Sequence, residues 1–151
     1  MKASTQLDAD LALLRTLADF RHELRRFLHF SEAAALEAGL QPQQHQLLLQ
    51  VAGAPNGDEV TISYAAERLS LKHNSTVELV DRSEREGLLV RRIDGDDKRR
   101  ALLSVTAKGR KILARLSIDH ARELNEMAPR LVKALEQIRR SAIPAGAAEA
   151  R

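Results

Sequence analysis

The side chains best suited to chemistry in this sequence gather in its middle, and their types favour contact with nucleic acid. Residues 72–111 carry 11 basic and 7 acidic side chains, whereas residues 1–71 carry 6 basic and 9 acidic ones. Clustered Lys and Arg side chains attract a phosphate backbone whatever its base sequence. The charge distribution therefore predicts an electrostatic contact surface in residues 72–111, even though the net charge of the whole chain is only +3.

The stretch from residue 73 to residue 78 offers groups that can read base edges. In the major groove an amide can pair with adenine, a hydroxyl can bond a base or a phosphate, and an apolar side chain can contact the thymine methyl group. The candidate contacts are His73, Asn74, Ser75, Val77 and Glu78. Glu78 would repel phosphate but could accept a hydrogen bond from cytosine, so its outward position favours base reading. An ordinary amphipathic surface helix over residues 72–86 is the alternative interpretation.

Further cations belong to a predicted hairpin. Residues 88–93 and 100–105 have the composition of two strands, and the Asp- and Gly-rich segment between them suits a turn. An arginine near such a tip can enter a narrow, strongly negative minor groove. A solvated strand edge guarded by charge is the alternative, but three consecutive cations at positions 98–100 favour DNA. The candidate contacts are Arg91, Lys98, Arg99 and Arg100.

Metal and catalytic chemistry find little support in the sequence. Asp94, Asp96 and Asp97 lack the spacing and the closing Glu of an EF-hand loop. We interpret them as turn residues, with Asp97 orienting a neighbouring arginine. The five histidines fall in different predicted elements, the chain has no cysteine, and it lacks the common phosphate-binding and nucleophile motifs. We expect no metal, no cofactor and no enzymatic activity.

The elements predicted around these residues form a mainly α fold with one small β-hairpin. Apolar residues recur at helical spacing through the N-terminal part of the chain, and Gly39 ends this first helix. Pro42 suits the start of a second helix. Thr61 can cap a short third helix ending near Leu69, and a fourth helix over residues 73–86 follows after a brief turn. Two short helices joined so tightly outline a helix-turn-helix.

Periodicity also indicates which faces of these elements point inward. On the strand over residues 100–105, alternation places Ala101, Leu103 and Val105 on one face. Behind the hairpin, Thr106 can cap a last long helix, in which Pro129 begins a further helical segment. The inner face of the helix over residues 73–86 is predicted to comprise Thr76, Leu79, Val80 and Ser83.

Composition sets the remaining limits. Apolar residues make up 44% of the chain but aromatic ones only 3%, so the core must be built mostly from aliphatic side chains, as in helix-rich proteins. Acidic residues near the N-terminus argue against a signal peptide, and no apolar run is long enough for a membrane span. We expect a cytoplasmic protein that does not contact a membrane.

Two stretches of the sequence resemble the MarR family of bacterial regulators. The first runs from Ser75 to Arg82 and continues from Glu84 to Leu89. The second combines Asp97-Lys98-Arg99 with the segment Leu103 to Gly109, similar to the family's wing and to the entry of its dimer helix. The resemblance implies that Arg99 is the wing arginine, that Asp97 orients it, and that residues 73–78 begin the recognition helix.

The resemblance also implies an organisation for the whole chain. Residues 1–40 and 107–142 would form a helical dimerisation region, residues 41–106 a winged helix-turn-helix module, and residues 143–151 a disordered tail. Ser83, Tyr64-Ala65 and Glu78 depart from the family's usual residues and put the operator sequence in doubt more than the fold.

The expected function is that of a homodimeric, sequence-specific DNA-binding transcription regulator. It would bind a pseudo-palindromic operator in double-stranded DNA as a repressor and be released by a small aromatic or anionic effector, for which the sequence indicates no pocket residues. A helical protein-interaction module with a winged fold that does not bind DNA is the alternative.

Overall fold

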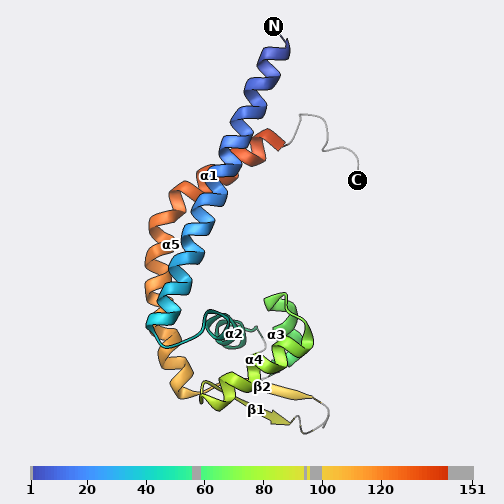
Figure 1. Ribbon diagram of the computed structural model, residues 1–151, viewed down its shortest axis with the longest axis vertical. Coiled ribbons are helices and arrows are strands. Elements are labelled where there is room, and N and C mark those ends of the chain that lie inside the picture. The colour runs from blue at the N-terminus through green and yellow to red at the C-terminus, as the bar shows by residue number, and fades with distance from the viewer. Residues whose placement is uncertain (1, 56–58, 94, 96–99, 143–151) are drawn as a thin grey trace. The chain divides into compact units, whose positions relative to one another are not determined.

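The computed structural model describes residues 2–55, 59–93, 95 and 100–142. It is mainly helical with one antiparallel hairpin, which confirms the predicted fold class (Figure 1). None of the described helices combines the length and apolar character needed to cross a membrane. In chain order the elements are α1 (Lys2–Glu37), α2 (Pro42–Ala52), α3 (Ile62–Leu69), α4 (His73–Arg85), β1 (Leu89–Ile93), β2 (Ala101–Val105) and α5 (Ala107–Ala142).

The chain divides into two compact units. One unit, called here the winged unit, comprises Ser31–Asp119 and holds α2, α3, α4 and the hairpin. The other, called the helical unit, comprises Met1–Phe30 with His120–Arg151, and so contains the first part of α1 and the last part of α5. The boundaries between the units fall inside these two long helices.

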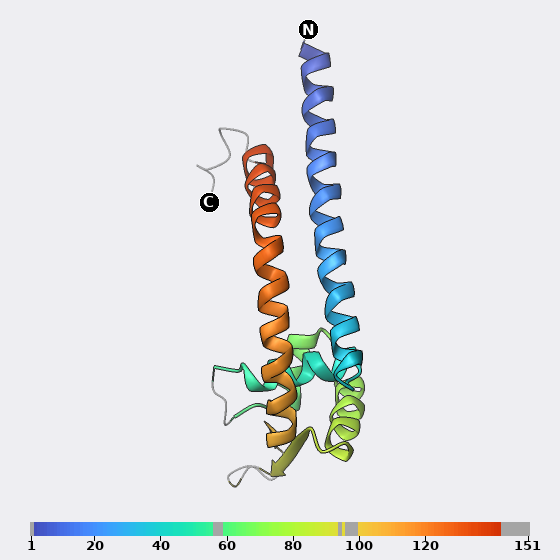
Figure 2. The same ribbon diagram turned by 90° about the vertical axis from the view of Figure 1, so that its left-hand side faces the viewer.

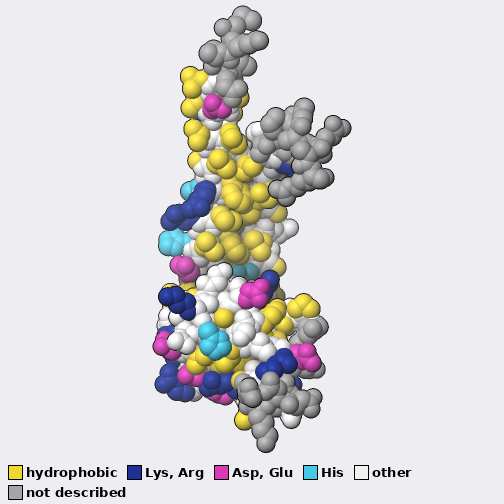
Figure 3. Space-filling view, turned by 90° about the vertical axis from the view of Figure 1, so that its right-hand side faces the viewer, with side chains coloured by type: hydrophobic (Ala, Val, Ile, Leu, Met, Phe, Trp, Pro, Cys, Tyr) yellow, Lys and Arg dark blue, Asp and Glu magenta, His cyan; other side chains and the backbone are white. Residues whose placement is uncertain are grey.

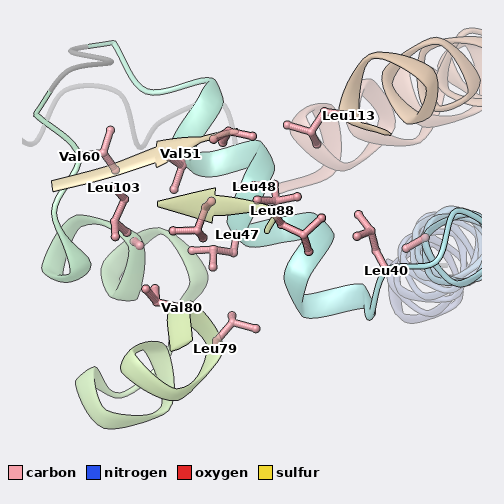
Figure 4. Close-up of a cluster of buried hydrophobic side chains, with 14 of the residues drawn as sticks. Leu40, Leu47, Leu48, Val51, Val60, Leu79, Val80, Leu88, Leu103 and Leu113 are labelled. Carbon is pink, nitrogen blue, oxygen red and sulfur yellow. The ribbon is translucent and has the colours of Figure 1, made fainter. Parts of the chain in front are cut away.

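The core of the winged unit is aliphatic, as the composition predicts (Figure 4). Burying each such Leu or Val side chain contributes about 1.5–3 kcal/mol relative to leaving it in water. The predicted inner face of α4 is confirmed, because all four of its residues are buried. Side chains that are 3% exposed or less include Leu47, Leu48 and Val51 from α2, Leu79 and Val80 from α4, and Leu103 from β2.

The turn between α3 and α4 has the tight geometry predicted for a helix-turn-helix. The Thr61 hydroxyl caps α3 by accepting a hydrogen bond from the Tyr64 amide at 3.1 Å. Ser70 then adopts a left-handed conformation with φ 54°, and the Leu71 amide donates to the Ala66 carbonyl at 3.0 Å. This reverses the chain within a few residues, so α4 starts beside the end of α3.

The hairpin pairs β1 with β2 in one register, from Leu89 opposite Val105 to Ile93 opposite Ala101. The outer edge of β2 is also occupied, because the Leu103 amide donates to the Val60 carbonyl at 2.7 Å and Thr61 forms a bridge with Leu102. The predicted one-sided burial of β2 is therefore only partly right. Leu102, on the opposite face to Leu103, is buried as well.

The junction between α4 and α5 depends on a very close approach of the two backbones. Gly87 ends α4 with φ +71°, and the Thr106 hydroxyl donates to its carbonyl at 2.6 Å. The same hydroxyl accepts a hydrogen bond from the Gly109 amide at 3.1 Å, which confirms Thr106 as the cap of α5. A Cβ atom on Gly109 would lie 2.3 Å from the Leu88 carbonyl oxygen. Only glycine fits at position 109 without displacing backbone.

In the helical unit, α1 and α5 run antiparallel and side by side (Figure 2). The ring of His120 lies 5.9 Å from that of Phe27 and 5.3 Å from that of Phe30, both in edge-on geometry. Pro129, predicted to begin a new helical segment, instead lies inside the continuous α5. Proline removes one backbone donor, and the buried residues on either side, Met127 and Ala134, hold the helix in place.

Replacing Gly109 by Ala should destabilise the protein. The added methyl group cannot avoid the Leu88 carbonyl, and overpacking of this kind costs about 1–3 kcal/mol, partly offset by the better helix propensity of Ala. Urea unfolding should show a lower midpoint with an unchanged slope. Gly95→Ala is the matched control, because nothing lies within 4 Å of a Cβ at that position. Equal midpoints for the two variants would contradict the proposed close approach.

Candidate nucleic-acid interface

The first turns of α4 present a row of polar groups to solvent. The Thr76 hydroxyl donates to the Lys72 carbonyl at 3.1 Å and is itself buried, so it anchors the start of the helix. His73, Asn74, Ser75 and Glu78 are exposed, whereas Val77, predicted to be exposed, is half-buried. The accessible part of the Val77 side chain therefore still offers a small apolar surface among its polar neighbours.

Ser83 shows how α4 accommodates a polar residue on its inner face. The side chain is completely buried, and its hydroxyl donates to the Leu79 carbonyl one turn earlier at 2.8 Å. A buried hydroxyl with such a partner avoids the cost of an unmade hydrogen bond. The departure at Ser83 therefore leaves the fold of α4 intact.

A hollow in the winged unit brings the start of α4 together with the start of β2. It measures about 440 Å³, and its walls include His73 from α4 and Arg100, which directly precedes β2. Thr61 and Ser63, at the beginning of α3, complete the polar part of the lining. Two predicted contacts from separate elements thus border one concave surface.

Arg91 occupies a different position, between β1 and α4. Its guanidinium donates to Glu84 through Nε at 3.1 Å and Nη2 at 2.8 Å, and Nη2 also donates to Asp81 at 2.5 Å. The Arg91 backbone amide adds a further bond to Glu84 at 3.1 Å. These bonds join β1 to α4.

The Arg91 cluster changes the protonation equilibria of its members. Hydrogen bonds from the Arg91 side chain, and then from its backbone amide, lower the pKa of Glu84 below its usual value. The hydrogen bond to Glu84 in turn raises the pKa of Arg91. Both groups are charged at neutral pH. The positive charge of Arg91 therefore offsets the negative charges of Asp81 and Glu84 on this face of α4.

Sequence reasoning missed the two carboxylates that bind Arg91. Asp81 and Glu84 are three residues apart, which places them on one side of the helix, and the turn at Gly87 reverses the chain so that β1 lies beside α4 (Figure 1). That spacing was a usable signal, but the pairing with Arg91 depends on the packing of strand against helix.

A buried glutamine fixes the position of α2. Gln44 is 1% exposed, and its side chain accepts a hydrogen bond from the Gln41 amide at 2.9 Å while donating to the Glu86 carboxylate at 3.0 Å. The first bond caps α2, and the second ties that helix to the end of α4. Sequence reasoning did not single out this residue either.

Three of the predicted wing residues, Asp97, Lys98 and Arg99, lie outside the described residues. The predicted disordered tail, residues 143–151, does so too. Within the described ranges, no group of three or more His, Asp or Glu side chains could hold a metal ion.

Comparison with known proteins shows what the chain is similar to. A model of the MarR family matches residues 38–100. A solved MarR-family transcription regulator superposes with a TM-score of 0.74 at 18% identity, covering 94% of this chain and 93% of that one. A complex of S. aureus MepR with DNA superposes with a TM-score of 0.68 at 18% identity, and the match covers 82% of this chain and 90% of MepR. PcaV from Streptomyces coelicolor, in complex with its natural ligand, superposes with a TM-score of 0.58 at 26% identity, and the match covers 80% of this chain and 89% of PcaV. No curated protein sequence matches the chain.

Glu84→Gln should reduce stability in a pH-dependent way. A carboxyl group whose pKa is lowered by folding stabilises the fold above its unfolded pKa, close to the ordinary 4.5. This contribution is lost as the pH falls through the lowered value. Because the pair is partly solvated, we expect a loss of about 1 kcal/mol near pH 7.

The measurement is the free energy of unfolding of both proteins between neutral pH and about pH 3, where the difference should shrink. Glu67→Gln, at an exposed position on α3, is the control and should change little. A difference between Glu84→Gln and the parent protein that stays constant with pH would contradict the ion-pair interpretation.

Proposed function

Because this chain belongs to the MarR family of transcription regulators, we propose that it binds operator DNA as a homodimer and represses transcription until a small-molecule effector releases it. The family comprises regulators rather than enzymes. A MepR structure contains DNA and a PcaV structure contains a natural ligand. These relatives support both kinds of partner for this chain.

The shared hollow at the start of α4 carries the DNA-binding part of the proposal. A helix fits the major groove, and a neighbouring ribbon can then follow the flanking backbone or minor groove. His73 and Arg100 border one surface, so the helix tip and the base of the wing can meet the same duplex. Asn74, Ser75, Val77 and Glu78 would read base edges from the exposed side of α4.

The cations of the hairpin have different proposed roles. Arg100 would contact phosphate at the edge of the hollow, and Lys98 and Arg99 would extend the contact along the wing, with Asp97 orienting Arg99. Arg91 would act mainly through the recognition helix, because its guanidinium is engaged by Asp81 and Glu84. In that role it holds α4 and the wing in a common orientation for the groove.

A second copy of the chain is the proposed partner of the helical unit. Large apolar side chains remain exposed along α1 and α5, and Figure 3 shows hydrophobic side chains covering one face of these helices. A contiguous exposed apolar face of this kind marks an interaction site, and a two-fold axis lets one face bury its own copy. The most exposed include Leu7 and Leu14 at 62%, Leu28 at 55% and Val132 at 52%.

Replacing Arg100 by Ala should weaken DNA binding without unfolding the protein. A lost phosphate contact in each copy of a dimer lowers the slope of log K against log salt concentration by about 2. Fluorescence anisotropy on an operator selected from genomic fragments, repeated at several salt concentrations, measures this slope. Arg115→Ala, an exposed cation on α5, is the matched control. Binding by neither the parent protein nor the control at any salt concentration would reject DNA binding and favour a protein-interaction module.

Replacing both Leu14 and Leu28 by Glu should convert the dimer to a monomer of 16.8 kDa. Each copy loses two buried leucines worth about 1.5–3 kcal/mol apiece, so the dimer dissociation constant should rise at least about 100-fold. Sedimentation equilibrium measures the mass. Leu49→Glu, an equally apolar exposed position on α2, should leave the dimer intact. A monomeric parent protein would refute the proposed assembly.

A further inference from the structure

The exposed face of α1 in the helical unit carries two opposite charges within a row of leucines. From Leu7 to Leu24 the row follows the alternating spacing of three and four residues that is typical of helices packed in a coiled coil. Its leucines are 39% to 62% exposed. In chain order the row, called here the leucine row, consists of Leu7, Asp10, Leu14, Leu17, Arg21 and Leu24.

The leucine row lies on the side of α1 that points away from α5. With 3.6 residues per turn, its six side chains fall within an arc of about 100°, and Asp10 and Arg21 differ in direction by roughly 20°. The residues that contact α5, Glu23, Phe27 and Phe30, point roughly 140° away from the centre of the row. The described part of α5 therefore leaves the row uncovered, and both charged side chains are exposed.

The leucine row is symmetric about a point midway between Leu14 and Leu17. In both directions from that point a leucine is followed by a charged residue and then by another leucine. The two charges have opposite signs, and each lies about 8 Å from the midpoint along the helix axis. A row with this symmetry can pack against a second copy of itself that runs in the opposite direction.

Charge distinguishes the two orientations in which identical helices can pair. In a parallel pair, Asp10 would face Asp10 of the partner subunit, and Arg21 would face Arg21 of the partner subunit. In an antiparallel pair centred between Leu14 and Leu17, Asp10 faces Arg21 of the partner subunit, and the two-fold axis repeats this contact. Like charges at an interface repel, whereas opposite charges attract. The two charges therefore favour the antiparallel pair.

We propose that α1 pairs in antiparallel orientation with α1 of a second copy, through two ion pairs between Asp10 and Arg21. Leu14 and Leu17 would pack across the two-fold axis, and Leu7 of each chain would meet Leu24 of the other. Asp10 also has an interaction within its own chain, but a carboxylate accepts several hydrogen bonds and keeps capacity for a guanidinium. This register specifies the homodimer proposed above and rests on that assembly.

The two ion pairs would act on specificity more than on stability. The penalty for taking both charges out of water offsets much of their attraction, so a matched pair adds little compared with apolar side chains. An unmatched charge enclosed at the same place strongly weakens the contact. A slipped register, or pairing with a chain that lacks these charges, would leave each charge unmatched. Asp10 and Arg21 would thereby select a second copy of this chain as the partner.

Charge reversal tests the pairing by sedimentation equilibrium of the full chain. Asp10→Arg would bring arginines face to face at both contacts, and Arg21→Asp would do the same with aspartates. Each variant alone should therefore raise the dimer dissociation constant at least about 100-fold. An equimolar mixture of the two variants should form a heterodimer within about tenfold of the parent affinity, because every arginine then meets an aspartate. The double variant should dimerise for the same reason.

Asp8→Arg and Arg15→Asp are the matched controls. They make the same charge changes at exposed positions of α1 outside the leucine row, so neither should change the dissociation constant. Circular dichroism establishes that each variant is folded. If a single reversal unfolds the chain, a double-mutant cycle of Asp10→Asn and Arg21→Gln takes its place, and the two losses should not add.

Recovery in the mixture is a result that a general effect of charge would not give. The antiparallel pairing is overturned if the single reversals leave a dimeric parent unchanged, or if neither the mixture nor the double variant restores what they lose. Additive losses in the double-mutant cycle would overturn it as well. In each of these cases the parent is still a dimer, so the proposed function stands. A monomeric parent protein would instead overturn both the pairing and the proposed assembly.

Discussion

The start of α5 approaches the end of α4 so closely that position 109 has no room for a side chain. Thr106 closes this junction with one hydroxyl, which donates to the Gly87 carbonyl and accepts from the Gly109 amide. Because β1 begins two residues after Gly87 and β2 ends directly before Thr106, the same bonds bring both hairpin ends to the C-terminal end of α4. The orientation of the wing relative to α4 follows from this backbone contact.

Electrostatics then divide the surface of the winged unit into two regions. Arg91 compensates Asp81 and Glu84 along the later turns of α4, where a row of carboxylates would repel a phosphate backbone. The first turns of α4 carry no such cluster, and His73 and Arg100 border their hollow. A surface that combines neutral polar groups with nearby cations suits base reading flanked by phosphate contacts. The acidic Glu78 is compatible with this division because it can accept a hydrogen bond from a base.

The helical unit has two chemically different faces. One carries exposed leucines, whose burial would provide the driving force for self-association. The other carries charges that the described residues leave partly uncompensated, around a hollow between α1 and α5. Both faces are built from the same pair of helices, α1 and α5. Glu23 on α1 and Arg130 on α5 lie 3.1 Å apart and link the two helices.

The sequence alone determined most of the secondary structure and the place of the polar helix tip. Caps at Thr61 and Thr106, the glycine stop after α4 and the inner face of α4 were predictable because they depend on neighbours within a few residues in the chain. The motifs at residues 75–89 and 97–109 also indicated the family.

Only the tertiary structure decided which charges meet. Arg91 was predicted to contact DNA, but its bonds to Asp81 and Glu84 depend on how a strand packs against a helix. Leu102 is buried although it lies on the opposite face of β2 to Leu103, and α5 continues through Pro129, between buried Met127 and Ala134. Local patterns record the propensities of short segments, whereas contacts between segments distant in the chain are set by the fold as a whole.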